Sequence, residues 1–404
     1  MSNTIIYHLF GAKEYDYQRL IIEDSTIRFG IKRKQGYIKC PKCDSRDIVT
    51  RGSRNRSLRA LPTGHYRKIF LDVKVHLIHC KTCNARMQED IPILPFPKAH
   101  HTKVFEYIAY DLLEKSTVLD VAEYCKLDWD TVKEIDKRRL KRKQSNFLYK
   151  HLHYLALDEV YLGIKKKYKT IILNLETGKI IKVDNGRGKD AVAPFFKKLK
   201  SYGKNLQAIA MDMSGAYYSA TKEYLPDIDI IFDHFHIVKL MNEKIDFLRR
   251  EYQNKLNEKN KKVIKGKRYL LLMNPEKMSE KQQAELSQVL ELNTPLTTAY
   301  ILKEELRILW NCQTEETGKE YLKSWIVRAQ NTDIKQMKQI AKTLTKHQQG
   351  VTNYFKHKIR SGELTGHRLS TGPLEGVNNK IKTMLRKTYG LRDEEYLKLK
   401  LLNL

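Results

Sequence analysis

HYLALDEVYLG at residues 153–163 and LQAIAMD at residues 206–212 are the stretches that decide the fold of this chain. The first opens a series of three β-like runs, which continues with KYKTIILNLE and KIIKVDNG and turns at Thr177-Gly178. A helical pattern at 189–203 leads to the second stretch, and a short helix then precedes a last strand, DIDIIFD. The predicted order is therefore βββαβαβ.

This order predicts which strands are neighbours. Three meander strands followed by right-handed crossovers form a mixed sheet in which the first and fourth strands lie side by side, the arrangement of ribonuclease H-like folds. Asp158 ends the apolar part of the first strand, and Asp212 ends the fourth. The two carboxylates are expected to face one another, and each raises the pKa of the other unless a cation is bound between them. Magnesium suits such hard oxygen ligands.

A third carboxylate, Glu375, lies near the start of a helix predicted to begin at Gly372-Pro373, run through Lys387 and stop near Gly390. Packed on the sheet, this helix would bring Glu375 to the two aspartates. Three carboxylates could hold two Mg²⁺ or Mn²⁺ ions, one activating the attacking oxygen and one stabilising the leaving oxygen of a phosphodiester. The spacing alone does not establish such a site, because isolated acidic residues are usually surface groups.

Composition points to a polyanionic partner. The 404 residues include 76 Lys and Arg against 47 Asp and Glu, which gives a formal charge of +29, and 41% of the chain is hydrophobic. That apolar content excludes a disordered polybasic tail and suggests about two to four domains. Nucleic acid is the first candidate partner and an anionic membrane surface the second. Neither a membrane-spanning run nor a secretory leader is evident, so a soluble cytoplasmic protein is expected.

Five segments are predicted. The chain is expected to be a multidomain α+β protein: a zinc ribbon, a helix-turn-helix, and a ribonuclease H-like α/β catalytic domain interrupted by an all-helical insertion. The β-rich module is expected to contain strands such as YIKC and KIFLDVKVHLIHC and to end in a Pro-rich linker. The segments are 1–97 (zinc module), 98–150 (helix-turn-helix), 151–240 (catalytic, first part), 241–365 (insertion, heavily charged) and 366–404 (catalytic helix with Glu375).

Two cysteine pairs predict a structural zinc site. Cys40-Pro-Lys-Cys43 and Cys80-Lys-Thr-Cys83 each place two thiolates within one turn, and four sulfurs form a closed tetrahedral site with no position for a catalytic water. Such an ion would stabilise a module that looks too poor in apolar residues to fold alone. His76 or His79 could replace a sulfur, although a basic or packing role is favoured for His79. Cys125 and Cys312 are expected to be buried thiols.

Residues 116–143 predict a helix-turn-helix, with a break around 126–128 and a second helix that carries an excess of basic residues. This second helix suits a major groove, its early positions near base edges and its later ones on phosphates. An interdomain linker helix with solvated charges is the alternative. The basic segment 51–68 could also contact phosphates, or be a solvated loop. The candidate DNA-binding residues of the helix are Lys133, Lys137, Arg138, Arg139, Lys141 and Arg142.

Four motifs together resemble a known family. ALDEV around Asp158, MDMSGAY around Asp212, FDHFHIVK at 232–239 and TGPLEGVNNKIKTMLRKTYGLRD at 371–393 are similar to the DDE motifs of bacterial insertion-sequence transposases. The group with an N-terminal zinc ribbon, the ISL3 family, is the nearest resemblance. It extends over nearly the whole chain, and Gly-Pro-x-Glu-Gly-x-Asn-Asn-Lys is its most specific motif.

The resemblance implies a catalytic triad of Asp158, Asp212 and Glu375 and a helical insertion before the glutamate. It also implies an Asp-x-x-His motif at Asp233 and His236, with the histidine near the scissile phosphate. Lys380, Lys382 and Arg386 on the last helix are expected to follow the DNA backbone. Met213 and His234 stand where family members often have arginine, and the second cysteine pair is more closely spaced than usual. None of these departures removes a metal ligand.

The leading hypothesis is a DNA transposase that binds terminal inverted repeats through residues 1–150, cleaves the element ends and joins the freed 3′-hydroxyl to target DNA. A dimer or larger assembly on double-stranded DNA is expected, because two ends are handled together. The alternatives are a non-catalytic DNA-binding regulator and a metal-dependent nuclease without strand transfer. Trp310 and Trp325 are expected in the core of the insertion, although stacking on a flipped base is conceivable.

Overall fold

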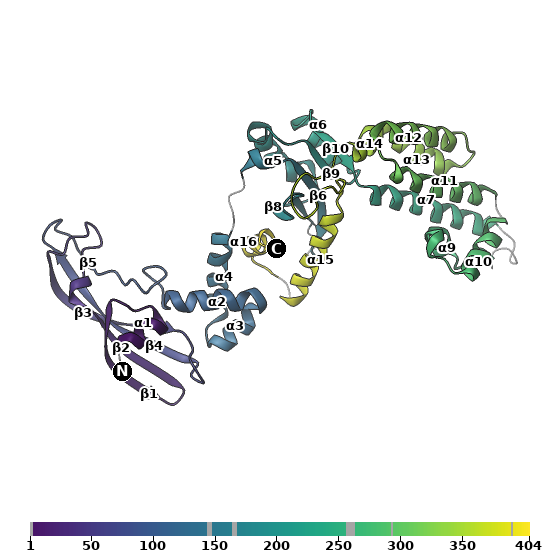
Figure 1. Cartoon of the computed structure of the whole chain (residues 1–404). Coiled ribbons are helices and arrows are strands. Elements are labelled where there is room, and N and C mark those ends of the chain that lie inside the picture. The colour runs from purple at the N-terminus through teal and green to yellow at the C-terminus, as the bar shows by residue number, and fades with distance from the viewer. Residues whose placement is uncertain (1–2, 144–147, 164–167, 256–262, 292–293, 389–390) are drawn as a thin grey trace. The chain divides into compact units, whose positions relative to one another are not determined.

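The computed structural model describes residues 3–143, 148–163, 168–255, 263–291, 294–388 and 391–404 (Figure 1). The chain divides into two compact units, Met1–Gln144 with Lys387–Tyr389, and Ser145–Arg386 with Gly390–Leu404. Each unit is described by itself.

The first unit begins with a mixed β-sheet in the order β1-β2-β4-β3, in which β5 also pairs with β4. Strands β3 and β4 form a long antiparallel ribbon, whereas β2 and β4 are parallel. Among the strands β3 pairs only with β4, and a single bridge joins its Arg59 to His101, so it is the edge strand of this sheet. The elements are α1 (Asn3–Phe10), β1 (Tyr15–Glu23), β2 (Thr26–Arg33), η1 (Gln35–Tyr37), β3 (Ile48–Ala60), β4 (Lys68–Cys80) and β5 (Arg86–Gln88).

This sheet has an apolar core of its own, which corrects one prediction. Buried side chains of α1, β1, β2 and β4 pack together with Ile91 and Leu94 of the Pro-rich segment. The module is therefore not too poor in apolar residues to pack. Two local predictions also fail: residues 37–40 (YIKC) form no strand, because Tyr37 ends η1 and residues 38–40 are irregular, and α1 stands where only β-like runs were expected.

Three helices complete the first unit: α2 (Lys103–Lys115), α3 (Val118–Cys125) and α4 (Trp129–Lys143). A capping box between Thr117 and Asp120 starts α3, and Lys126 ends it in the left-handed conformation with φ 51°. The break predicted at 126–128 is confirmed. Apolar residues on one side of α3 and α4, among them Val121 and Ile135, are buried, as a helix-turn-helix requires.

The second unit is built on a sheet in the order β10-β9-β6-β7-β8. Strands β6, β7 and β8 form an antiparallel meander, and β9 and β10 add in parallel on the other side of β6. The predicted order βββαβαβ and the adjacency of the first and fourth strands are confirmed. The elements are η2 (Tyr149–His151), β6 (Tyr154–Tyr161), β7 (Tyr168–Asn174), β8 (Lys179–Asn185), α5 (Lys189–Tyr202), β9 (Ala208–Met211), α6 (Gly215–Tyr224) and β10 (Asp229–Phe232).

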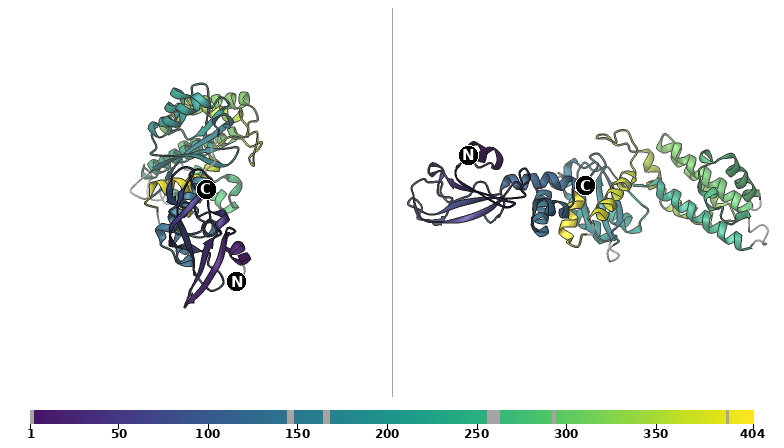
Figure 2. Two further views of the ribbon diagram at one scale, coloured as in Figure 1. Left: turned by 90° about the vertical axis from the view of Figure 1, so that its left-hand side faces the viewer. Right: turned by 90° about the horizontal axis from the view of Figure 1, so that it is seen from below.

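Alternation along the strands separates the two faces of this sheet. Leu155, Leu157 and Met211 pack against Phe195 and Tyr217, which belong to α5 and α6. Asp158 is on the other face, where α15 (Gly372–Lys387) lies beside the sheet (Figures 1 and 2). The helix predicted at the C-terminal motif is confirmed through Lys387, and its predicted stop at Gly390 lies outside the described residues. Helix α16 (Glu394–Leu402) packs near β8.

A helical region lies between β10 and α15 in sequence, and the expected boundary at 240 falls within its first helix, α7. Trp325 is fully buried in its core and donates its indole N–H to the Leu302 carbonyl at 2.8 Å. No helix in the described part of the chain has the length and apolarity to span a membrane. The elements are α7 (His234–Lys255), α9 (Arg268–Leu272), η4 (Pro275–Lys277), α10 (Glu280–Glu291), α11 (Thr294–Ile308), η5 (Leu309–Asn311), α12 (Glu315–Gln330), α13 (Lys335–Lys346), α14 (Gln348–Thr352) and η6 (Asn353–Phe355).

Candidate active site and DNA-binding surfaces

Asp158 lies within β6, and Asp212 directly follows β9, the strand beside it. The β6–β9 ladder pairs Tyr154 with Ala208 and Ala156 with Ala210. The same offset relates Asp158 to Asp212, two positions beyond the last printed pair. Both side chains therefore leave the same face of the sheet at the carboxyl end of β9, as predicted from the sequence.

A surface depression of about 280 Å³ joins Asp158 to four of the other predicted site residues. Asp212 does not line it, and its Oδ1 accepts the backbone N–H of Ser214 at 3.0 Å. Asp212 nevertheless lies close to Asp158, because its charge affects the pKa of that residue. The lining consists of Asp158, Asp233, Phe235, His236, Lys239, Thr371, Gly372, Glu375, Asn378, Asn379 and Lys382.

The groups around Asp158 do not offset the effects of its burial and of the neighbouring Asp212 carboxylate on its pKa. Burial raises the pKa of Asp158, and the charge of Asp212 raises it further. A hydrogen bond from the Glu159 backbone, the His236 charge and a hydrogen bond from Asn378 lower the pKa, but these effects are smaller in sum. Since the whole chain carries a charge of +29, this anionic pair is exceptional.

Glu159 is a nearby carboxylate that the sequence analysis did not single out. Burial and the charge of Asp212 raise its pKa. It follows Asp158 directly and so points to the opposite face, where it approaches Tyr217 of α6. Its position within the quoted ALDEV motif was the available signal.

Asp233 connects β10 to the start of α15. It is 2% exposed, and its Oδ2 accepts the Thr371 hydroxyl, just before α15 begins. Burial by itself raises the pKa of Asp233, but hydrogen bonds from His234, Thr371 and the Phe235 backbone lower it below its usual range. The Nδ1 atom of His236 lies 3.9 Å from Asp233 Oδ2. Asp233 is thus a charged anchor for the helix that bears Glu375.

The basic residues expected on α15 differ in placement. Lys382 lines the depression with Glu375. Arg386 lies about one turn beyond Lys382 on the same side of the helix, whereas Lys380 points more than a quarter-turn away from Glu375. All three side chains are exposed.

The four predicted cysteines come together. Their sulfur atoms all lie within 4.8 Å of one another, with Cys40 3.6 Å from Cys83 and Cys43 3.6 Å from Cys80. Backbone hydrogen bonds from Cys83 and Thr82 lower the pKa of Cys80 to about 6. A backbone hydrogen bond from Ser45 lowers the pKa of Cys43, yet burial and the neighbouring sulfurs raise it to about 12. The cluster could therefore hold a metal ion that stabilises several thiolates.

Neither nearby histidine belongs to this cluster. The Nδ1 atom of His76 lies 2.6 Å from Glu89 Oε1, and His79 Nε2 lies 2.7 Å from Asn84 Oδ1. Cys125 is a buried thiol, as predicted, and Cys312 is only half-buried. Trp310 is half-buried beside His234, with 5.5 Å between ring centroids.

The basic residues of α4 have two different surroundings. Arg138 and Arg142 face α2, where they lie 3.1 Å and 3.5 Å from the carboxylate of Glu106. Arg139 is buried and pairs with Asp136 at 2.8 Å. These arginines stabilise α4 and its packing against α2. The sequence analysis, which considered only the number of basic residues on this helix, did not predict that role. Lys133 lies over the exposed Trp129 ring, and Lys141 is exposed.

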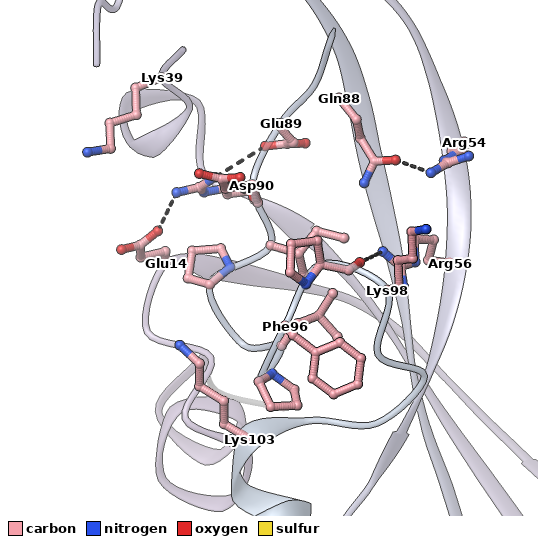
Figure 3. Close-up of a pocket in the computed structure, with 16 residues that line it drawn as sticks. Glu14, Lys39, Arg54, Arg56, Gln88, Glu89, Asp90, Phe96, Lys98 and Lys103 are labelled. Carbon is pink, nitrogen blue, oxygen red and sulfur yellow. Dashed lines mark hydrogen bonds and ion pairs between the residues drawn. The ribbon is translucent and has the colours of Figure 1, made fainter. Parts of the chain in front are cut away.

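A groove of about 640 Å³ adjoins the edge strand β3 in the first unit. In Figure 3 its labelled basic side chains, among them Lys39, Arg54 and Lys103, surround the Phe96 ring and the neighbouring prolines. Arg33, at the base of the groove, is 4% exposed and pairs with Glu14 at 2.8 Å. Lys98 and Lys103 are exposed at its margin.

Comparisons with known proteins give the class of this chain. A family model described as "Transposase" matches residues 155–401, and another, described as "Helix-turn-helix domain of transposase family ISL3", matches residues 97–140. The matched regions are those of a transposase with a helix-turn-helix DNA-binding domain. The chain belongs to the ISL3 family of transposases.

Individual proteins are similar over most of their length. The transposase for insertion sequence element IS1001 of Bordetella parapertussis is 29% identical over 99% of this chain and 98% of its own. The transposase for IS1557 of Mycobacterium tuberculosis (strain H37Rv) is 24% identical over 89% and 84%. Among solved structures, the Drosophila P element transposase strand transfer complex has a TM-score of 0.41 at 11% identity, covering 74% of this chain and 90% of that one.

Proposed function

We propose that this chain is a DDE-type DNA transposase in which Asp158, Asp212 and Glu375 form the catalytic triad. One observation carries the proposal: Asp158 and Asp212 share a register on adjacent parallel strands, and Glu375 lines the same depression as Asp158. The family membership supports an activity that cleaves and transfers DNA.

The donor set fits divalent magnesium or manganese. The three carboxylates offer only oxygen, which these hard cations prefer. Burial and the Asp212 charge raise the pKa of Asp158, so a cation would be favoured there. When bound, two such ions supply Lewis-acid stabilisation of the attacking and leaving oxygens.

The remaining side chains of the depression would bind the DNA strand. Lys239 and Lys382 provide positive charge beside the carboxylates and suit phosphate oxygens flanking the scissile bond. His236, partly exposed in the same depression, would donate a hydrogen bond to a phosphate oxygen. Asp233 would act indirectly, by anchoring the start of α15.

Each of the five predicted segments would be a functional domain or part of one. A ribonuclease H-like catalytic domain, 151–240 with 366–404, would be interrupted by the helical insertion 241–365. Zinc at the four cysteines would stabilise the tip of the β3–β4 ribbon in the module 1–97. Terminal inverted repeats would be bound by this module and by the helix-turn-helix within 98–150, with Lys133, Lys137 and Lys141 towards the DNA.

The protein would act as a dimer or larger assembly in a bacterial cytoplasm. Two element ends are cut and joined in one reaction, which a dimer or larger assembly on DNA would accomplish. The bacterial insertion-sequence relatives support action in a bacterial cytoplasm.

The decisive experiment replaces the carboxylates without changing their size. Asp158→Asn, Asp212→Asn and Glu375→Gln should each lower cleavage of end DNA in Mg²⁺ by on the order of a thousandfold. Binding of end DNA without added Mg²⁺ or Mn²⁺ should stay at the parent value. Asp190→Asn, an exposed aspartate on α5, is the matched control. Undiminished cleavage by Asp158→Asn would refute the triad.

The same assay separates the alternatives. Cleavage without joining to target DNA would identify a nuclease, and specific binding without cleavage in Mg²⁺ or Mn²⁺ a regulator.

A further inference from the structure

Asn378 is hydrogen-bonded to Asp158 across a long stretch of sequence. Its Nδ2 donates to Asp158 Oδ2 at 2.8 Å, and the Glu159 backbone N–H donates to Asp158 Oδ1 at 2.7 Å. Both oxygens of Asp158 therefore have a donor that fixes the side chain. One of these donors comes from α15, the helix that carries Glu375.

The other end of the Asn378 amide is unsatisfied. Its Oδ1 is buried and has no hydrogen-bond partner among the described residues. An ionised carboxylate can only accept hydrogen bonds, so the amide nitrogen must face Asp158 and the oxygen must face away. A buried carbonyl oxygen left unpaired is unfavourable, because it has lost the hydrogen bonds that it would accept from water. Asn378 lines the depression shared by Asp158 and Glu375, so a partner for Oδ1 is expected in that space.

We propose that Asn378 is a positioning residue of the divalent-metal site. Through Nδ2 it fixes the orientation of Asp158, and through Oδ1 it accepts a hydrogen bond from a water molecule on the ion held by Asp158. Magnesium and manganese keep several waters when bound, and such outer contacts orient the ligands and tune affinity. This inference rests on the proposed function, because it presumes that Asp158 is a metal ligand.

The position of Asn378 on α15 also supports its role as a positioning residue. The Thr371–Asp233 hydrogen bond anchors the start of the helix at the end of β10, and the Asn378–Asp158 bond anchors the next turns at β6. Glu375 lies between these two contacts. Since one anchor reaches Asp158 within β6 and the other reaches Asp233 directly after β10, they fix the glutamate relative to the sheet.

The test measures metal binding rather than activity alone. Isothermal titration of the zinc-loaded full chain with Mn²⁺ should give a Kd at least about tenfold weaker for Asn378→Ala. Asn378→Leu, which keeps the side-chain volume but removes the amide, should weaken Mn²⁺ binding equally. End-DNA binding by the zinc-loaded chain without added Mg²⁺ or Mn²⁺ should remain within about twofold of the parent for both variants, since the positioning role concerns only the catalytic metal site. Thr383→Ala, an exposed position on the same helix, is the control.

The outcomes are distinct. A parent-like Mn²⁺ affinity in both Asn378 variants would overturn the inference, even if their melting temperature fell, because a merely structural role lowers stability without altering affinity. Parent-like Mn²⁺ affinity in Asp158→Asn would instead overturn the metal site of the proposed function. Weakened affinity in Asp158→Asn together with both Asn378 variants supports the two proposals jointly.

Discussion

At the scale of single residues, the second unit shows which functional contacts a sequence pattern can reveal. Asp158 and Asp212 were predicted as neighbours because each ends an apolar run, and the order of the runs determines which strands pair. Asn378 could not be assigned in this way. An amide in a polar helix carries no signal of its own, and its contact with Asp158 depends on how α15 packs against the sheet.

Glu106 provides a prediction about pH at this scale. Burial by itself raises the pKa of Glu106, but hydrogen bonds from His101, Arg138 and Tyr110 lower it to about 2, against 4.5 for the free group. The stabilisation is therefore complete above about pH 4.5 and is lost as the pH falls towards 2. Glu106→Gln should cost about 3 kcal/mol at pH 7.

Thermal unfolding of the full chain between pH 7 and pH 3 measures this effect. The difference in melting temperature between parent and Glu106→Gln should shrink as the pH falls below 4.5. Glu123→Gln, on the exposed side of α3, should melt like the parent throughout. A difference that persists unchanged at pH 3 would show that Glu106 acts through packing and not through its charge.

At the scale of elements, periodicity and turn residues predicted the strands of the second unit, whereas the sheet of the first unit was only partly predictable. The parallel pairing of β2 with β4 depends on where the β3 strand between them in sequence folds back. No local sequence pattern determines where β3 folds back. Helix α1 has only eight residues, which is too short to show a clear helical period.

Removing one cysteine of the four-cysteine cluster should release the zinc ion and loosen the nearby ends of β3 and β4. Cys43→Ser should lose bound zinc, measured as metal content per chain, whereas Cys312→Ser should retain it. Hydrogen exchange should rise at 40–48 and 78–86, where the two cysteine turns join the ends of β3 and β4. Strands β1 and β2 should keep their protection, because they belong to the separate apolar core. Loss of protection throughout the sheet would contradict this division.

At the scale of the whole molecule, the formal charge of +29 should make the affinity for DNA fall as the salt concentration rises. Each phosphate contact contributes about −0.9 to the slope of log affinity against log salt. The double variant Lys98→Gln/Lys103→Gln, at the margin of the first-unit groove, should reduce the magnitude of this slope by up to about 2. Fluorescence anisotropy of labelled end DNA from 50 to 300 mM salt is the measurement, those concentrations being roughly the range in which such slopes are resolved.

Lys204→Gln is the matched control for this variant, because Lys204 is exposed beyond α5, at the opposite end of the sheet from Asp212. An identical slope for the double variant and the parent would exclude the groove as a phosphate-binding surface, while leaving the helix-turn-helix unaffected.

The late position of Glu375 also has a consequence for synthesis on the ribosome. Residues 3–143 and the strands that bear Asp158 and Asp212 emerge well before α15, since at about 5–20 residues per second the intervening chain takes on the order of 10 to 30 s to make. During that interval a nascent chain has its DNA-binding helices but lacks the residues that complete the depression. Under the proposed function, a chain released early would bind element ends without cutting them, and so would inhibit the full-length protein by competition.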